Sequence, residues 1–88
     1  MRIIDQWGSA DIQYENAAIM LDDGNIIAYL PAAAGNNLKV LLAEYSDGDV
    51  ARTAMKKLRI HYQRNLNTFE RAVGIMTEYF QFPPEEHL

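Results

Sequence analysis

The chain of 88 residues contains no cysteine and only two histidines, His61 and His87. The absence of cysteine excludes a disulfide scaffold, a thiolate metal site and a thiol nucleophile. The two histidines are far apart in the sequence, and neither has a partner at metal-ligand spacing. We therefore expect no metal and no bound cofactor.

The common catalytic patterns are also missing. The sequence has no glycine-rich phosphate loop, no serine in a nucleophile elbow and no helix with paired histidines. Neighbouring carboxylates occur at Asp22-Asp23 and at Asp47 and Asp49, but hairpin turns and helix starts favour acidic residues for structural reasons. No combination of residues indicates catalysis, so we expect a non-enzymatic protein without catalytic residues.

No apolar run approaches the roughly 20 residues that a membrane-spanning helix needs. The first residues also lack the basic and then apolar pattern of a signal peptide. Hydrophobic residues make up 49% and charged residues 23% of the chain, which is typical of a globular domain. We expect a cytoplasmic protein with no membrane contact, built as one domain over residues 1–82 with a flexible acidic tail at 83–88.

The clearest periodic pattern is helical and begins near Asp47. One apolar stripe runs along about five turns, formed by Ala51, Ala54, Met55, Leu58 and Tyr62. Ser46 is the expected N-cap, accepting the backbone N–H of Asp49. After Arg64, either one helix runs on to residue 79 or the chain breaks near Asn65 and a second helix follows. We favour the break because asparagine is a weak helix former and a good cap.

The chain before this helix has the pattern of β-strands, at residues 2–5, 11–15, 17–21, 26–30 and 38–45. The third and fourth of these flank Asp22-Asp23-Gly24-Asn25, which predicts a hairpin. Residues 77–82 are an alternative closing strand before Pro83. The predicted fold class is therefore α+β, an antiparallel sheet of about four or five strands packed against one main α-helix, with a possible second helix.

Two features indicate exposed apolar surface. The central strands carry apolar residues on both faces, and the helix covers one face only. The rest of the chain, curling of the sheet or a second copy must cover the other face, and we favour a homodimer. Trp7, the single tryptophan, is expected at the edge of the core or packed in a turn. An exposed Trp7 would instead indicate an interface.

Charge is unevenly distributed along the chain, although the net charge is only −4. Residues 1–49 hold eight acidic and two basic side chains, residues 50–71 hold six basic and one acidic, and residues 72–88 hold three acidic and none basic. The ordinary interpretation is a solvated helix face whose cations offset nearby carboxylates. The alternative is an electrostatic contact surface for a macromolecular partner.

The residues also resemble a known family in three blocks that span the chain. These blocks are the opening Met1-Arg2-Ile3-Ile4 with Gln6, Gly8, Asp11 and Tyr14-Glu15, the join Tyr45-Ser46 followed by Ala51, Ala54-Met55, Leu58-Arg59 and Tyr62, and the closing Phe80-Gln81-Phe82-Pro83. In this respect the chain resembles an uncharacterised family of small proteins encoded by phages and prophages of Gram-positive bacteria. The resemblance implies a phage accessory protein in a bacterial host, and by analogy of class an inhibitor of a host defence system such as a CRISPR nuclease.

Two modes of binding follow as hypotheses. In the first, a protein partner binds the acidic residues in a stoichiometric complex, and the contact residues are Asp11, Glu15, Asp22, Asp23, Asp47 and Asp49. In the alternative, the basic segment 50–64 binds nucleic acid or acts as a regulatory surface, through Arg52, Lys56, Lys57, Arg59 and Arg64. The sequence pI near 4.9 opposes the usual charge of a nucleic-acid-binding domain.

Overall fold

A computed structural model describes residues 1–31, 37–72 and 79–88, and for residues 65 and 67–72 it describes the backbone only. The elements in chain order are β1 (Arg2–Ile4), β2 (Asp11–Gln13), the 3₁₀-helix η1 (Tyr14–Asn16), β3 (Ala18–Asp22), β4 (Asn25–Pro31), β5 (Asn37–Glu44), α1 (Gly48–Ala72), β6 (Tyr79–Gln81) and the 3₁₀-helix η3 (Glu85–His87). The predicted α+β fold class is confirmed.

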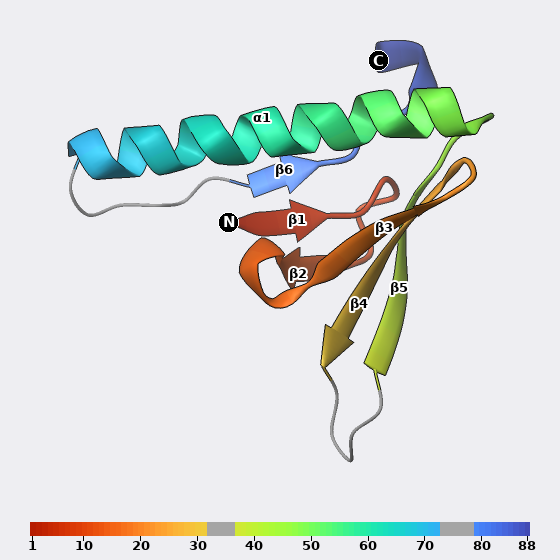
Figure 1. The fold of residues 1–88 in the computed structure, drawn as a ribbon, viewed down its shortest axis with the longest axis horizontal. Helices are drawn as coiled ribbons and strands as arrows, with labels where there is room; N and C mark the ends of the chain where they lie inside the picture. Colours follow the sequence, from red (N-terminus) through yellow and green to blue (C-terminus); the bar gives the residue numbers. More distant parts are fainter. Residues whose placement is uncertain (32–36, 73–78) are drawn as a thin grey trace.

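The described strands form two three-stranded sheets, in the orders β2-β1-β6 and β3-β4-β5. In Figure 1, α1 runs along one side of the molecule above β6, β1 and β2, while β4 and β5 extend away from it. The expectation of one antiparallel sheet is wrong, because β6 pairs in parallel with β1, placing Ile3 opposite Phe80. Strands at opposite ends of a chain leave no local pattern that predicts their pairing.

The predicted hairpin is confirmed in β3 and β4. Asp22 pairs with Asn25 across a two-residue turn, and Asp23 in that turn has a φ of 58°. The turn packs against the end of β5, where the backbone N–H of Tyr45 donates to the carbonyl oxygen of Gly24 at 2.8 Å. This contact ties the hairpin to the chain just before α1.

The core lies where α1 meets the sheets, and its largest fully buried side chains are Ile3, Ile26, Leu42, Leu58 and Phe82. The predicted helix stripe is confirmed. Its members Ala51, Ala54 and Leu58 are buried, and Met55 packs against the same cluster.

One face of the β3-β4-β5 sheet is turned away from this core. Met20, Ile27 and Leu41 lie in one row across the three strands. Ile27, in the middle of the row, is 5% exposed, but Met20 is 56% and Leu41 39% exposed. The described chain therefore leaves part of this apolar face open, as the sequence indicates, and its burial by a second copy remains a prediction.

The helix differs from the sequence-based prediction at both ends. α1 runs through Asn65 to Ala72, so the favoured break near Asn65 is wrong. Asparagine costs a helix interior only about 0.7 kcal/mol relative to alanine, less than the cost of nucleating a new helix. Residues 73–78 lie outside the described part, and the alternative closing strand is confirmed by β6 at Tyr79–Gln81.

The N-cap is Asp47, one residue later than predicted. Its Oδ1 accepts the backbone N–H groups of Asp49 at 2.9 Å and Val50 at 3.0 Å. Ser46 instead donates its backbone N–H and its hydroxyl to the carboxylate of Glu85, at 2.7 and 2.8 Å. Glu85 of η3 is therefore joined to the start of α1, and the flexibility expected for residues 83–88 stays a prediction.

Trp7 is 56% exposed, so the expectation of a packed tryptophan is wrong, and the alternative role at an interface stays a prediction. Its neighbour Gln6 joins the turn to β5, because the Gln6 backbone N–H donates to the carbonyl oxygen of Leu42 at 2.7 Å. No helix of the described residues is long and apolar enough to cross a membrane.

Candidate binding surfaces

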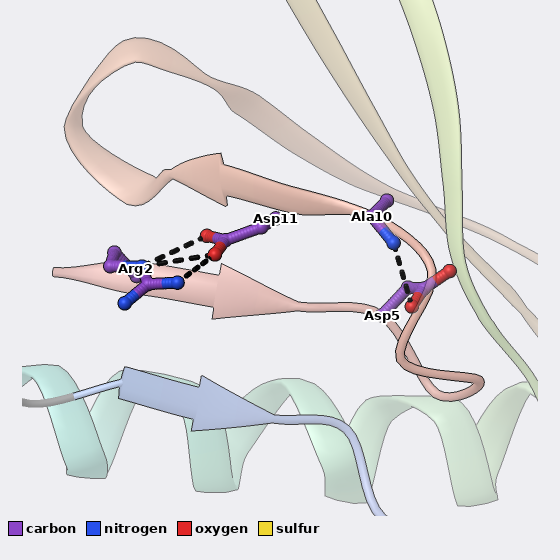
Figure 2. Close-up of polar contacts among 4 residues, drawn as sticks. All are labelled: Arg2, Asp5, Ala10 and Asp11. Carbon is purple, nitrogen blue, oxygen red and sulfur yellow. Dashed lines mark hydrogen bonds and ion pairs between the residues drawn. The ribbon is translucent and has the colours of Figure 1, made fainter.

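The first two acidic residues of the predicted contact surface are held by cations at the start of the chain. Asp11 on β2 faces Arg2 on β1, and the guanidinium and carboxylate form a two-pronged ion pair (Figure 2). The hydrogen bond from Arg2 lowers the pKa of Asp11. Glu15 accepts hydrogen bonds from the N-terminal amine of Met1 at 2.9 and 2.7 Å. Burial, the largest single effect, raises the pKa of Glu15, but the hydrogen bond and charge of the amine, together with the other hydrogen bonds to this carboxylate, outweigh it, so the pKa is lowered.

Two further acidic residues serve the start of α1. Asp47 caps the helix, and Asp49 lies 3.2 Å from the guanidinium of Arg52. Asp22 and Asp23 remain in the exposed hairpin turn, with no ion pair to any described residue. The turn lies beside the helix start, since an added Cβ on Gly48 would be 3.3 Å from the carbonyl oxygen of Asp23. The structure thus gathers Asp22, Asp23, Asp47 and Asp49 at one end of α1.

The predicted basic residues lie along α1, on the exposed side of its apolar stripe. Arg52 belongs to the ion pair with Asp49. The other four form no ion pair with any described residue and are exposed, and we call them the basic face: Lys56, Lys57, Arg59 and Arg64. The positive charges of the basic face are therefore unpaired within the described part of the chain, whereas the negative charges of Asp11, Glu15 and Asp49 are neutralised by ion pairs.

An apolar side chain that the sequence reasoning missed lies within the basic face. Ile60 is 42% exposed. A hollow of about 600 Å³ on one side of it is lined by Lys56, Arg59 and Arg64, and a second of about 360 Å³ on the other side is lined by Lys57, His61 and Phe80. The available signal was an isoleucine outside the apolar stripe, surrounded in sequence by cations.

A separate groove of about 530 Å³ lies between α1 and β3. Its walls include Ile19 from β3 and Met55 and Leu58 from α1. The rings of Tyr14 and Tyr62 also line it, and their centroids are 4.3 Å apart. The groove is mixed in character, because the charged side chains of Glu15 and Arg59 also line it, and it lies beside β3, an edge strand of its sheet.

Among the described residues, no group of three or more histidine, cysteine, aspartate or glutamate side chains is placed to hold a metal ion. Comparisons with known protein families, with curated proteins and with solved structures find no match to this chain. The resemblance to phage-encoded proteins accordingly stays a prediction. The residues define a small α+β protein with two candidate surfaces, the basic face and the groove between α1 and β3.

Proposed function

We propose that this chain is a non-enzymatic binding protein that forms a stoichiometric complex with an acidic protein partner through the basic face of α1. The observation that carries the proposal is the exposed Ile60 among Lys56, Lys57, Arg59 and Arg64, which make no ion pair with described residues. An apolar centre with a charged rim is the usual anatomy of a protein interface.

The charges support this surface over the acidic one that the sequence favours. Asp11, Glu15 and Asp49 are neutralised by ion pairs, and Asp47 is held by two backbone N–H groups. A partner that recruited these carboxylates would first have to break those contacts. The cations of the basic face are solvated, so an acidic partner gains attraction without that cost.

A protein partner fits better than nucleic acid. The chain carries a net charge of −4, which repels a polyanion at long range. Ile60 also adds nothing to a phosphate contact, but it gives a protein partner an apolar anchor. If the resemblance to phage proteins holds, an acidic component of a host defence system is the favoured partner, which would make the protein an inhibitor of that system.

The test is affinity capture from host lysate with and without nuclease, comparing the natural chain with three variants. We expect Lys56→Glu/Lys57→Glu and Ile60→Ser to lose a nuclease-resistant protein partner, and Asp22→Lys/Asp23→Lys to keep it. All four substituted charges are exposed, so circular dichroism should show the same fold. Rising salt should weaken the complex. Capture that nuclease abolishes would favour nucleic acid, and loss only in the aspartate variant would favour the acidic surface.

A further inference from the structure

The edge strand β3 has backbone groups without partners in its own sheet. Asp22 and Asn25 flank a two-residue turn, so they form a hydrogen-bonded pair, and hydrogen-bonded pairs then recur at every second residue. Ile19 and Leu21 consequently direct their N–H and C=O groups away from β4. Among the described residues, no hydrogen bond outside the β3-β4 ladder engages these groups.

β3 also has few of the features that usually protect an edge strand. Its one charged residue is Asp22 at its end, it contains no proline, and its pairing with β4 has no bulge. The opposite edge of the sheet is different, because β5 carries Lys39 and is joined to the β1-β2 turn. There Gln6 donates to the carbonyl of Leu42, and the Gln6 side-chain oxygen accepts the N–H of Glu44 at 2.9 Å.

We propose that β3 pairs with β3 of a second copy, in an antiparallel register centred on Met20. In this register Ile19 lies opposite Leu21 of the second copy, and Leu21 opposite its Ile19. Both are hydrogen-bonded pairs, so all four free backbone groups of each strand find partners. Asp22 comes to lie opposite Ala18, so the two strands place no like charges face to face.

The same register fills the groove between α1 and β3. Ile19 and Leu21 lie on the side of the sheet that faces α1, because residues alternate across a strand and both pack against the core cluster. Leu21 of the second copy, placed beside Ile19, therefore enters the groove between β3 and α1, against Met55 and Leu58. Two symmetry-related grooves are filled in this way.

The helices are positioned to meet across the two-fold axis. α1 begins beside Asp23 and passes Ile19 at Met55, so it runs antiparallel to β3. α1 packs on both β3 and β4, so its axis lies about one strand spacing from the two-fold axis of the proposed dimer. The two copies of α1 are then about 10 Å apart, which is an ordinary distance between packed helices. The antiparallel arrangement turns the acidic start of each helix, at Asp47 and Asp49, toward the basic middle of the other, which is complementary in charge.

The experiment is sedimentation velocity of the natural chain and two variants, up to about 0.5 mM, above the micromolar range expected for a small interface. Met20→Lys places two cations together at the two-fold axis, and Met20 is 56% exposed, so the fold should survive. We expect at least tenfold weaker dimerisation. The matched control is Leu41→Lys, an exposed apolar residue of the same sheet face on β5, and it should dimerise like the natural chain.

Hydrogen exchange gives a second readout. We expect the amides of Ile19 and Leu21 to gain protection with rising protein concentration in the natural chain and to lose it in Met20→Lys. A monomer at all concentrations would overturn the proposal, and so would a dimer that survives Met20→Lys. If Leu41→Lys weakened dimerisation as much as Met20→Lys and these amides gained no protection, the proposal would also be overturned, and the dimer would form by packing of the exposed sheet faces. Met20 lies outside the basic face, so Met20→Lys tests the dimer without altering a residue on which the proposed function rests.

Discussion

Asp5 and Ser9 are joined by two hydrogen bonds in the turn between β1 and β2, from the Ser9 backbone N–H at 2.6 Å and from its hydroxyl at 2.8 Å. The backbone N–H of Ala10 donates a third, at 3.1 Å (Figure 2). Asp5 is 3% exposed, the one buried charged side chain among the described residues. Burial opposes its charge, but these hydrogen bonds outweigh burial and lower its pKa.

Asp5→Asn should therefore destabilise the protein in a pH-dependent way. A lowered pKa in the folded state stabilises above the unfolded value of about 4, and this contribution is lost as the pH falls through the folded pKa. We expect a loss of about 2 kcal/mol at pH 7, since the hydrogen bonds are to a charged group. Urea unfolding of the variant and the natural chain at pH 7 and at about pH 3 measures this loss of stability. An unchanged gap between variant and natural chain at the two pH values would contradict the role of the charge.

Tyr45 should make the stability sensitive to alkaline pH. Its hydroxyl donates to the carbonyl oxygen of Pro83 at 2.8 Å, and burial, followed by the charge of Glu85, raises its pKa to about 12. The raised pKa stabilises the fold below the unfolded value of about 10, and the contribution is lost as the pH rises toward the folded value. Tyr45→Phe should cost about 1 kcal/mol at pH 7, and this difference should shrink near pH 11.

The matched control is Tyr79→Phe, because Tyr79 is 53% exposed. It should leave the free energy of unfolding unchanged at both pH values. Burial raises the pKa of Tyr62 as well, so absorbance titration of the phenols should show late ionisation of both residues, and Tyr45→Phe should remove only the part that belongs to Tyr45. A late absorbance change of the same size in that variant would assign the raised pKa to another tyrosine.

Gly24 and Gly8 should respond differently to alanine. A Cβ on Gly24 would lie 2.2 Å from the carbonyl oxygen of Tyr45, a backbone atom that cannot rotate away. Gly8 has room, with the nearest atom 3.6 Å away, but its φ is +76°. We expect Gly8→Ala to cost about 1 kcal/mol for the left-handed backbone and Gly24→Ala at least about 2 kcal/mol. Urea unfolding measures the loss of stability in each variant, and equal losses in Gly8→Ala and Gly24→Ala would contradict the close packing of the hairpin turn.

The helix cap can be assigned by substitution and amide exchange. Asp47→Ala should cost about 1 kcal/mol and expose the amides of Asp49 and Val50 to exchange. Ser46→Ala is the control, because it removes the hydroxyl contact with Glu85 but leaves the cap. We expect those amides to stay protected in the control. Faster exchange in Ser46→Ala than in Asp47→Ala would restore the cap predicted from the sequence.

Local patterns predicted local structure well. The apolar stripe from Ala51 to Tyr62 and the turn at Asp22-Asp23-Gly24-Asn25 each involve residues close in sequence, so periodicity and turn chemistry were sufficient. Asn65 was misread because its helix penalty is small beside the cooperativity of a helix already formed. The location of the charged candidates was also predictable, since α1 carries the basic segment.

The sequence by itself determined the α+β class, the hairpin, the apolar stripe of the main helix and its positive charge, because each depends on residues a few positions apart. Only the tertiary structure decided that β6 joins β1, that Glu85 holds Ser46, and that Asp11 and Glu15 are neutralised by Arg2 and the N-terminus. These contacts join residues far apart in the chain or on neighbouring strands. Their energy depends on distances that folding alone sets, so the surface left free to bind a partner could not be found before the fold.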